Sequence, residues 1–299
     1  MHEERTVPAS GDESLAALSL PIVWEPWFDL SDAAARRTVK SVPGLYRVRR
    51  RDDGELVYVG QTSILGTRLR QLAVLYQAAI PYNDPHTATP CLWVLRTQHG
   101  VQFEVSVAHH EADVAARKAA ECVVISQYRR DSGRSPFANF GRMPEGWIKS
   151  SQNNLRLAGL GRVRRGYADP AAHRAPDHPS VLDPLHSPQS PMWSAQQWSE
   201  WTTPITAAPD LRGVYRVRSM VGEELVYLGQ GNIRDRLRAH AAKSRQDGHR
   251  QQTAFTGDLE ASWVELPQAS SQQLLEIECD LIAGHVLRLG EPPVAEFWG

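Results

Sequence analysis

The chain has 299 residues, with 33 Lys and Arg against 34 Asp and Glu and a net charge of −1. This length favours two domains of about 100–150 residues. The neutral balance neither argues for a nucleic-acid partner nor excludes one, so any basic surface has to come from local clustering. No stretch approaches the eighteen or so apolar residues of a membrane span, which predicts a soluble protein with no membrane partner.

The predicted elements begin after an acidic tail, residues 1–19, which lacks the apolar core of a signal peptide. Residues 44–50 and 55–61 are short, Val- and Tyr-rich segments around the turn "RDDG", which predicts a β-hairpin. An Arg-rich amphipathic helix is expected near 65–79, a third strand at 101–108 and a long helix near 112–130. The same order returns as a hairpin in 213–230, a helix at 233–245, a strand at 260–266 and a helix at 271–288.

The two hairpins are close copies of each other. "GLYRVRRRDDGELVYVGQ" (Gly44 to Gln61) and "GVYRVRSMVGEELVYLGQ" (Gly213 to Gln230) are identical at eleven of eighteen positions. "WEPW" and "WSEW" precede them, and "TRLRQL" and "DRLRAH" follow. The pattern predicts an α+β fold of two repeated small domains, each a three-stranded antiparallel sheet flanked by helices in the order ββαβα. The expected domains are 20–150 and 196–299.

The segment between the repeats, residues 151–195, reads as a linker. Its second part is dense in Pro, Ala, Ser and His, which is typical of an extended chain without a core. Its first part carries Arg162, Arg164 and Arg165 with no acidic residue nearby. A solvated loop and a DNA-phosphate-binding arm both fit that composition.

Four residues in each repeat, two tyrosines, an arginine and a glutamate, could carry chemistry. Tyr46 and Tyr58, like Tyr215 and Tyr227, lie on paired strands and could converge on one face of the hairpin. Aromatic packing explains one such pair, but both repeats keep the hydroxyl at both positions, and tyrosine is favoured over phenylalanine where the oxygen is used. Arg68 and Arg236 on the following helix could hold a phosphate through two hydrogen bonds, or face solvent.

A glutamate stands within each long, apolar helix. Burial of an unpaired carboxylate is unfavourable, so Glu121 and Glu278 need a cap, an arginine or a divalent cation. Mg²⁺ prefers a carboxylate together with waters and phosphate oxygens. Glu276 lies two residues before Glu278 and could be confused with it.

These features, in this order and twice in one chain, resemble the GIY-YIG nuclease superfamily over about 105 residues of each half. The resemblance implies catalytic roles for the two tyrosines and the arginine, and one Mg²⁺ or Mn²⁺ per active site on the glutamate. It assigns catalysis to Tyr46, Tyr58, Arg68, Tyr215, Tyr227, Arg236 and His240, metal binding to Glu121 and Glu278, and support to Asn139. Arg70 and Arg238 in the two "RLR" segments are expected to contact DNA together with the linker arginines.

The repeats depart from the family pattern in different places. His240 stands four residues after Arg236, where the family has His or Tyr, whereas the first repeat has Leu72. Asn139 occupies the family's asparagine position near the domain end, whereas the second repeat has Glu296. The second repeat is the expected stronger site because it keeps His240.

Two functions follow from this pattern. The first is a cytoplasmic, metal-dependent endonuclease that hydrolyses double-stranded DNA with an activated water, its two repeats forming a pseudo-dimer so that one chain could act as a monomer. The alternative is a catalytically degenerate module that binds DNA or a protein through the same surface. The three cysteines, Cys91, Cys122 and Cys279, have no paired spacing, which favours a reducing compartment. The paired tryptophans are expected to pack on their own sheet, with base stacking as the alternative.

Overall fold

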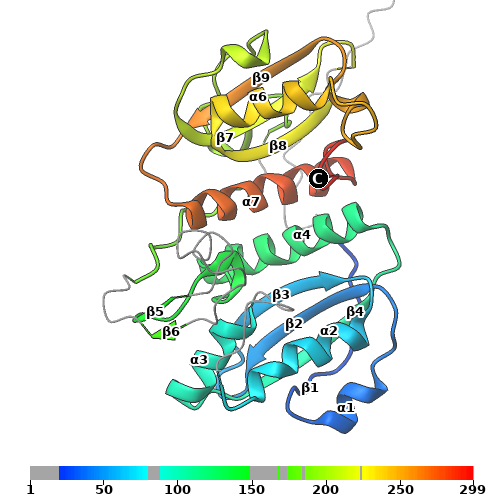
Figure 1. Ribbon diagram of the computed structural model, residues 1–299, viewed down its shortest axis with the longest axis vertical. Helices are drawn as coiled ribbons and strands as arrows, with labels where there is room; N and C mark the ends of the chain where they lie inside the picture. The colour runs from blue at the N-terminus through cyan, green and yellow to red at the C-terminus, as the bar shows by residue number, and fades with distance from the viewer. Residues whose placement is uncertain are drawn as a thin grey trace, which may run out of the picture.

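The computed structural model describes residues 20–79, 88–148, 167–168, 174–183, 186–222 and 224–298. It is a mixed α+β fold with two larger antiparallel sheets and a separate pair of two-residue antiparallel strands. Two long helices, α4 (Val114–Ser132) and α7 (Ser271–Leu289), lie side by side at its centre, with one sheet beyond each of them (Figure 1). We call residues 20–148 the first half and residues 186–298 the second half.

The sheet of the first half has four strands rather than the predicted three. The hairpin β2 (Gly44–Arg50) and β3 (Leu56–Thr62) forms as predicted, and β4 (Phe103–His109) pairs with β2. The extra strand β1 (Phe28–Asp29) pairs with the free edge of β4, which gives the order β1-β4-β2-β3. The three-strand prediction is therefore wrong for this half. Strand β1 was missed because two residues are too few to show an alternating pattern.

The sheet of the second half has the predicted three strands, β7 (Arg212–Ser219), β8 (Leu225–Asn232) and β9 (Leu259–Glu265), in the order β8-β7-β9. The pairing registers of the two hairpins correspond. Tyr46 lies opposite Gly60 in the first half and Tyr215 opposite Gly229 in the second. Each hairpin also has a register shift directly after its valine, Val48 or Val217.

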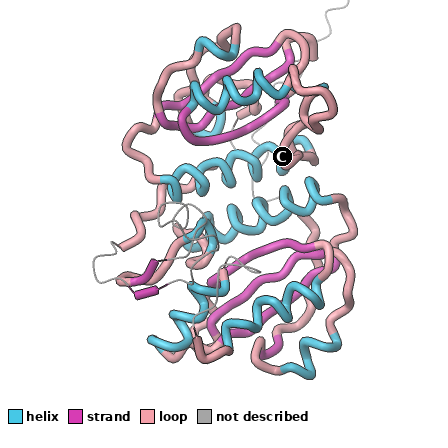
Figure 2. Tube along the Cα trace, viewed as in Figure 1, coloured by secondary structure: helices cyan, strands magenta, loops and turns pink. Residues whose placement is uncertain are grey.

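The helices follow the predicted order with two additions (Figure 2). The predicted Arg-rich helices are α2 (Leu65–Leu72), which continues as the 3₁₀ turn η2 (Ala73–Tyr76), and α6 (Ile233–Lys243). The unpredicted helices are α1 (Ala33–Thr38) and α3 (Thr89–His99). The remaining short elements are η3 (Asn139–Gly141), β5 (Trp147–Ile148), β6 (Tyr167–Ala168), η4 (Trp193–Ala195), η5 (Ile205–Ala207) and η6 (Thr253–Phe255).

Side-chain caps fix the start of both central helices. The Asp113 carboxylate accepts a hydrogen bond from the Ala116 amide at the start of α4. Ser270 and Gln273 form a capping box at the start of α7. Such caps satisfy backbone amides that have no partner within the helix, and they set the register of the residues that each helix presents.

The two halves share a hydrophobic core where α4 meets α7. Ala119 and Val123 of α4 belong to the same buried cluster as Leu281 and Ile282 of α7. The end of the predicted linker, residues 151–195, joins this cluster, since Trp193 is fully buried in it and Leu182 nearly so. The expectation of an extended linker without a core therefore does not hold for this stretch.

Buried charges also join the halves. Glu276 of α7 is fully buried and accepts hydrogen bonds from Arg129 and from Arg142, the latter at 2.7 Å from Nε. Oε2 of Glu276, which accepts from Arg129, also lies 3.0 Å from Nδ1 of His178. Asp280, one turn further along α7, pairs with Arg129 at 3.1 Å. The acceptors come from the second half and the arginines from the first, so this network fixes how the two helices dock.

Candidate active site

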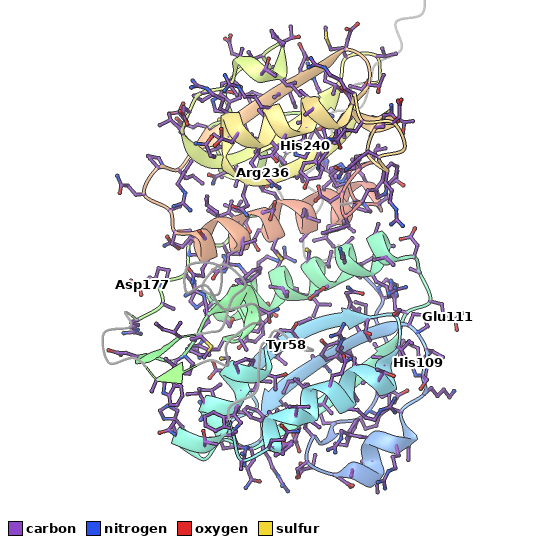
Figure 3. The ribbon with its side chains drawn as sticks, in the orientation of Figure 1. Tyr58, His109, Glu111, Asp177, Arg236 and His240 are labelled. Carbon is purple, nitrogen blue, oxygen red and sulfur yellow. The ribbon has the colours of Figure 1, made fainter. Side chains whose placement is uncertain are left out.

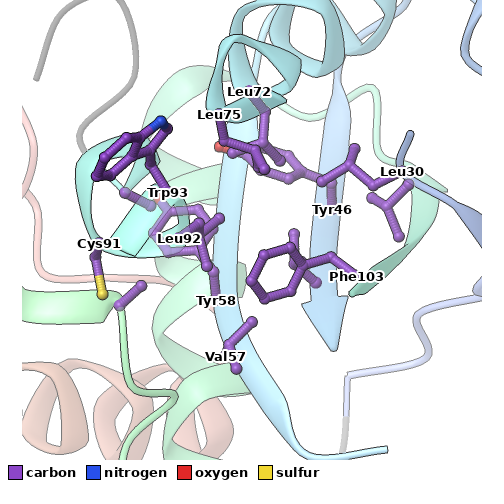
Figure 4. Packing of buried hydrophobic residues seen from close by; sticks show 14 of the residues in the cluster. Leu30, Tyr46, Val57, Tyr58, Leu72, Leu75, Cys91, Leu92, Trp93 and Phe103 are labelled. Atoms are coloured by element: carbon purple, nitrogen blue, oxygen red, sulfur yellow. The ribbon is translucent and has the colours of Figure 1, made fainter. Parts of the chain in front are cut away.

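The two hairpin tyrosines of each half lie on one face of the sheet, as the register requires. Tyr46 and Tyr58 are diagonal neighbours across β2 and β3, with ring centres 5.9 Å apart. Tyr215 and Tyr227 repeat the arrangement at 6.3 Å. Figure 4 shows Tyr46 and Tyr58 among the packed side chains of the first core. The predicted convergence of each tyrosine pair is confirmed.

The glycine after the second tyrosine leaves room for the first one. A Cβ on Gly60 would lie 2.4 Å from the Tyr46 hydroxyl oxygen, and a Cβ on Gly229 would lie 2.4 Å from that of Tyr215. Both distances are shorter than any real contact of a Cβ atom. Glycine is therefore needed at this position, because the end of the tyrosine ring lies directly against it.

Each predicted arginine reaches its tyrosine pair from the next helix. Arg236 lies one turn before His240 on α6, and both are labelled beside this helix in Figure 3. Its positive charge and its hydrogen bonds lower the pKa of Tyr215 and Tyr227, against the larger, opposite effect of burial. Arg68 acts on Tyr46 in the same sense. Arg236 is exposed, whereas Arg68 is half-buried, so the guanidinium of the second half is the more accessible to a phosphate.

A histidine completes the second site and is missing from the first. The Tyr215 hydroxyl lies 2.9 Å from Nε2 of His240, which is 1% exposed. Burial, with the charges of Lys243 and Arg236, lowers the pKa of His240 to about 3, so the imidazole is neutral at physiological pH and can accept a proton. Leu72 takes this place in the first half and is fully buried.

The tyrosines themselves are poor bases in this structure. Burial raises the pKa of Tyr46, Tyr215 and Tyr227 above the ordinary value near 10, and the nearby arginines offset only part of that rise. A phenol in this state keeps its proton at neutral pH. Proton transfer from Tyr215 therefore needs an acceptor, and His240 is within hydrogen-bond distance.

The two predicted metal ligands open into one cavity. Glu121 of α4 and Glu278 of α7 both line a cavity of about 330 Å³ between the halves. Burial raises the pKa of Glu121 to about 8 and that of Glu278 to about 7, while Arg68 and Arg236 respectively act in the opposite direction. Tyr58, Lys118 and Asn139 line the cavity from the first half and Phe297 from the second.

Asn139 and Glu296 occupy corresponding places on the hairpins. The Asn139 side chain accepts from the Val59 amide and donates to the Val59 carbonyl, both at 2.9 Å. In the second half, Leu228 stands where Val59 does, and its amide donates to Glu296 at 3.0 Å. Asn139 thus supports the backbone of β3, and Glu296 supports β8 with one of the same two hydrogen bonds.

The residues fit a weakly held divalent cation rather than an enclosed one. Within the described ranges, no cluster of three or more His, Cys, Asp or Glu side chains is arranged to hold a metal ion. Each half instead offers one carboxylate facing the cavity, and burial makes the charge of that carboxylate unfavourable without a cation. One carboxylate with waters and substrate oxygens is a common way for proteins to bind Mg²⁺.

The predicted DNA-contacting arginines are only partly described. Arg70 and Arg238 are both exposed on their helices. The Arg70 guanidinium donates to the Thr67 hydroxyl at 2.9 Å. Arg162, Arg164 and Arg165 lie outside the described residues.

The paired tryptophans pack on their own sheet rather than standing free. The Arg47 guanidinium lies 4.3 Å from the ring centre of Trp24 and 4.6 Å from that of Trp27. The second half has the same stack at 4.3 and 4.5 Å, made by Arg216 with Trp198 and Trp201. These cation–π contacts explain why "WEPW" and "WSEW" accompany the "YRVR" strands.

Two residues near the site have roles that the sequence did not predict. Glu276 is a partner of the buried arginines and not a cavity residue. Lys118 lines the cavity, and only its spacing of three residues before Glu121 placed it on the same side of a helix. Neither role has a signal in the local sequence.

Comparisons of the chain with models of protein families, with curated proteins and with solved structures each returned no match. Among the described residues, no helix has the length and apolar character needed to cross a lipid bilayer.

Proposed function

We propose that the chain is a Mg²⁺- or Mn²⁺-dependent endonuclease that acts on DNA and cuts at the site of the second half. The observation that carries this proposal is the hydrogen bond between Tyr215 and the buried, neutral His240, next to the exposed Arg236. A proton acceptor, a hydroxyl group and a guanidinium group therefore lie together, and the charge of Arg236 also acts on the carboxylate of Glu278.

The reaction would be hydrolysis of a phosphodiester by water. The water oxygen forms a bond to phosphorus while one bridging P–O bond breaks, and the departing oxygen takes a proton from solvent. His240 receives a proton through the Tyr215 hydroxyl as the water attacks, and Arg236 offsets the charge on the non-bridging oxygens. A divalent cation held by Glu278 would further stabilise that charge and lower the pKa of the attacking water.

We also propose that the two halves are copies of one domain. Support comes from the matching hairpin registers, the matching tyrosine pairs and the matching Arg–Trp stacks. In this view the first half is the degenerate copy. It has Leu72 in place of the histidine, and Arg68 is less exposed than Arg236.

A binding module without catalysis is the second candidate function. It is favoured by the burial of Tyr46, Tyr58 and Tyr215 and by the raised pKa of Tyr46 and Tyr215, which keep the hydroxyls protonated. The protein would then hold nucleic acid at Arg236 and Arg238 without cutting it.

Nicking of supercoiled plasmid in Mg²⁺ separates the two functions. We expect the wild type to nick, Arg236→Ala and Glu278→Gln to lose at least about 100-fold in rate, and Arg68→Ala and Glu121→Gln to change little. The matched variants of the first half also serve as controls for a contaminating nuclease, since all are purified alike. Binding of the plasmid without nicking by the wild type would favour the binding module.

The three cysteines are free, which agrees with a reducing compartment such as the cytoplasm. DNA is the proposed partner. Because the two halves form a pseudo-dimer, we propose that one chain acts as a monomer.

A further inference from the structure

Two cysteines occupy corresponding sequence positions on the two central helices. Cys122 directly follows Glu121 on α4, and Cys279 directly follows Glu278 on α7. These helices lie side by side where the halves meet (Figure 1). The pair therefore brings together two parts of the chain that are 157 residues apart.

The two thiol groups are close to each other. The Cys279 thiol donates a hydrogen bond to the Cys122 carbonyl oxygen, with Sγ and O 3.8 Å apart. A hydrogen bond between the two thiols lowers the pKa of Cys122 and raises that of Cys279, and burial raises both above their ordinary value. Ala119 of α4 and Ala283 of α7 belong to the buried cluster at this contact, and side chains this small let two helices pack closely. Such proximity is the geometric requirement for a disulfide bond between two helices.

The two cysteines differ in their access to solvent. Both line the cavity of about 330 Å³ between the halves. Cys122 is half-buried, whereas Cys279 is only 4% exposed. A small solute that enters the cavity therefore meets Cys122 first, with Cys279 next to it as the second thiol. An accessible thiol beside a second one that can close a disulfide is the usual arrangement of a redox-sensitive site.

We propose that Cys122 and Cys279 form an oxidative modification site, at which hydrogen peroxide converts the two thiols into a disulfide bond that links the halves. The Cys122 sulfur attacks one peroxide oxygen, the O–O bond breaks, and a first water leaves behind a sulfenic acid. The Cys279 sulfur then attacks the Cys122 sulfur, so that an S–S bond forms, the S–O bond breaks and a second water leaves. The two thiols lose two electrons in total, and the peroxide is reduced to two waters that carry away both thiol protons.

The disulfide would add a covalent link to a contact that is otherwise held by packing and charge. In the reduced protein the halves are joined by their shared core and by the ion pairs of Arg129 with Glu276 and Asp280. Because the two cysteines are far apart in the sequence, a bond between them strongly restricts the unfolded chain. Disulfides of this kind in a reducing compartment are transient, so the link would form under oxidising conditions and be removed when they end.

Peroxide treatment followed by peptide mapping tests the proposal without reference to nicking. The folded, reduced protein is treated with excess hydrogen peroxide, its remaining thiols are alkylated, and it is digested with trypsin without reduction. We expect one disulfide-linked pair of peptides, residues 119–129 and 251–288, in the monomeric protein. The melting temperature should rise by at least about 5 °C on oxidation and return to its first value after dithiothreitol.

The third cysteine provides a matched control. Cys91 lies in the core of the first half and on a different tryptic peptide, so Cys91→Ala should give the same linked peptides as the wild type. Cys122→Ala and Cys279→Ala should each lose the linked peptides and the rise in melting temperature. Thermal unfolding of the reduced variants checks their folds, and serine replaces alanine in any variant that is destabilised.

The possible results separate clearly. The proposal would be overturned if peroxide took Cys122 to the sulfinic acid while Cys279 stayed a thiol. Cross-links between chains only, or no reaction of either cysteine in the folded protein, would overturn it as well. Linked peptides in a protein that never nicks plasmid would support the disulfide, which does not depend on the proposed nuclease.

Discussion

Tyr215 and His240 are joined by a hydrogen bond of 2.9 Å, whereas the first half has the fully buried Leu72 at the corresponding sequence position, four residues after Arg68. The two halves therefore share a tyrosine pair and differ in whether a histidine or a leucine stands four residues after the arginine. The proposed division of labour between them depends on this difference.

Replacing the acceptor should stop cleavage without unfolding the protein. His240→Leu copies the residue that already packs at this position in the first half. We expect the single-turnover nicking rate to fall by about 10²- to 10⁴-fold, the usual range for loss of a general base, with plasmid binding retained. An unchanged rate would remove His240 from the mechanism.

The same histidine should make the protein sensitive to acid. Burial lowers the pKa of His240 from its ordinary 6.5 to about 3, so the unfolded chain binds a proton between these values that the folded chain does not. The free energy of unfolding therefore falls as pH decreases from 6.5, by roughly 1 kcal/mol at pH 5.5 from this group. Urea unfolding at pH 7.5 and 5.5 should show a smaller loss for His240→Leu than for wild type. Equal losses would mean that His240 is not held neutral.

Asn139 and Glu296 offer a matched exchange of amide and acid. Burial and Glu278 raise the pKa of Glu296 above its ordinary 4.5, so the folded state prefers the protonated acid and loses stability as pH rises above 4.5. Glu296→Gln keeps the acceptor for the Leu228 amide and removes the titration. We expect this variant to gain at least about 1 kcal/mol over wild type at pH 8 and less at pH 5.

The reverse exchange is its control. Asn139→Asp removes the donor to the Val59 carbonyl and introduces a buried carboxyl group. It should destabilise by about 1–3 kcal/mol at pH 8. If Glu296→Gln gave a gain that did not change with pH, protonation of Glu296 would not be its cause.

Metal affinity should rise with pH, because binding displaces protons from the glutamates. The pKa of Glu278 is raised to about 7 and that of Glu121 to about 8. In Glu121→Gln, Mn²⁺ binding measured by electron paramagnetic resonance should strengthen up to about pH 7 and then level off. In Glu278→Gln it should continue to strengthen up to about pH 8. Identical pH profiles for the two variants would show that neither glutamate titrates with the metal.

The sequence was sufficient for features that depend on local spacing. The hairpins, the order of helices and the convergence of each tyrosine pair follow from alternation along paired strands. Helix α3 was missed because Cys91, Leu92, Trp93 and Val94 are all buried in succession, which leaves no amphipathic period to detect. Contacts between distant residues were also missed, as with Asn139 and Val59, which are 80 residues apart.

Glu276 and Glu278 are hard to tell apart in the sequence for the same reason: their roles depend on contacts with distant residues. Both glutamates stand in the same apolar helix, and only their tertiary partners distinguish them. Arg142, which binds Glu276, is 134 residues away along the chain. No local pattern could assign one carboxylate to the interface and the other to the cavity.

Removal of the charge of Glu276 should lower the free energy of unfolding, whereas removal of the charge of Glu278 should leave it unchanged or raise it. Glu276→Ala leaves Arg129 and Arg142 buried beside each other without their shared acceptor. Breaking a buried ion pair in this way costs about 3–5 kcal/mol, and here the loss falls on the contact between the halves. Glu278→Gln breaks no ion pair among the described residues, and above pH 7 it removes a charge that burial disfavours. Guanidinium unfolding at pH 8 should therefore show a large loss of stability for Glu276→Ala, and no loss or a gain for Glu278→Gln. Under conditions where both variants are folded, nicking should be lost only in Glu278→Gln. Similar losses of stability in both variants would mean that Glu278, too, holds the halves together, and its assignment as a metal ligand would then fail.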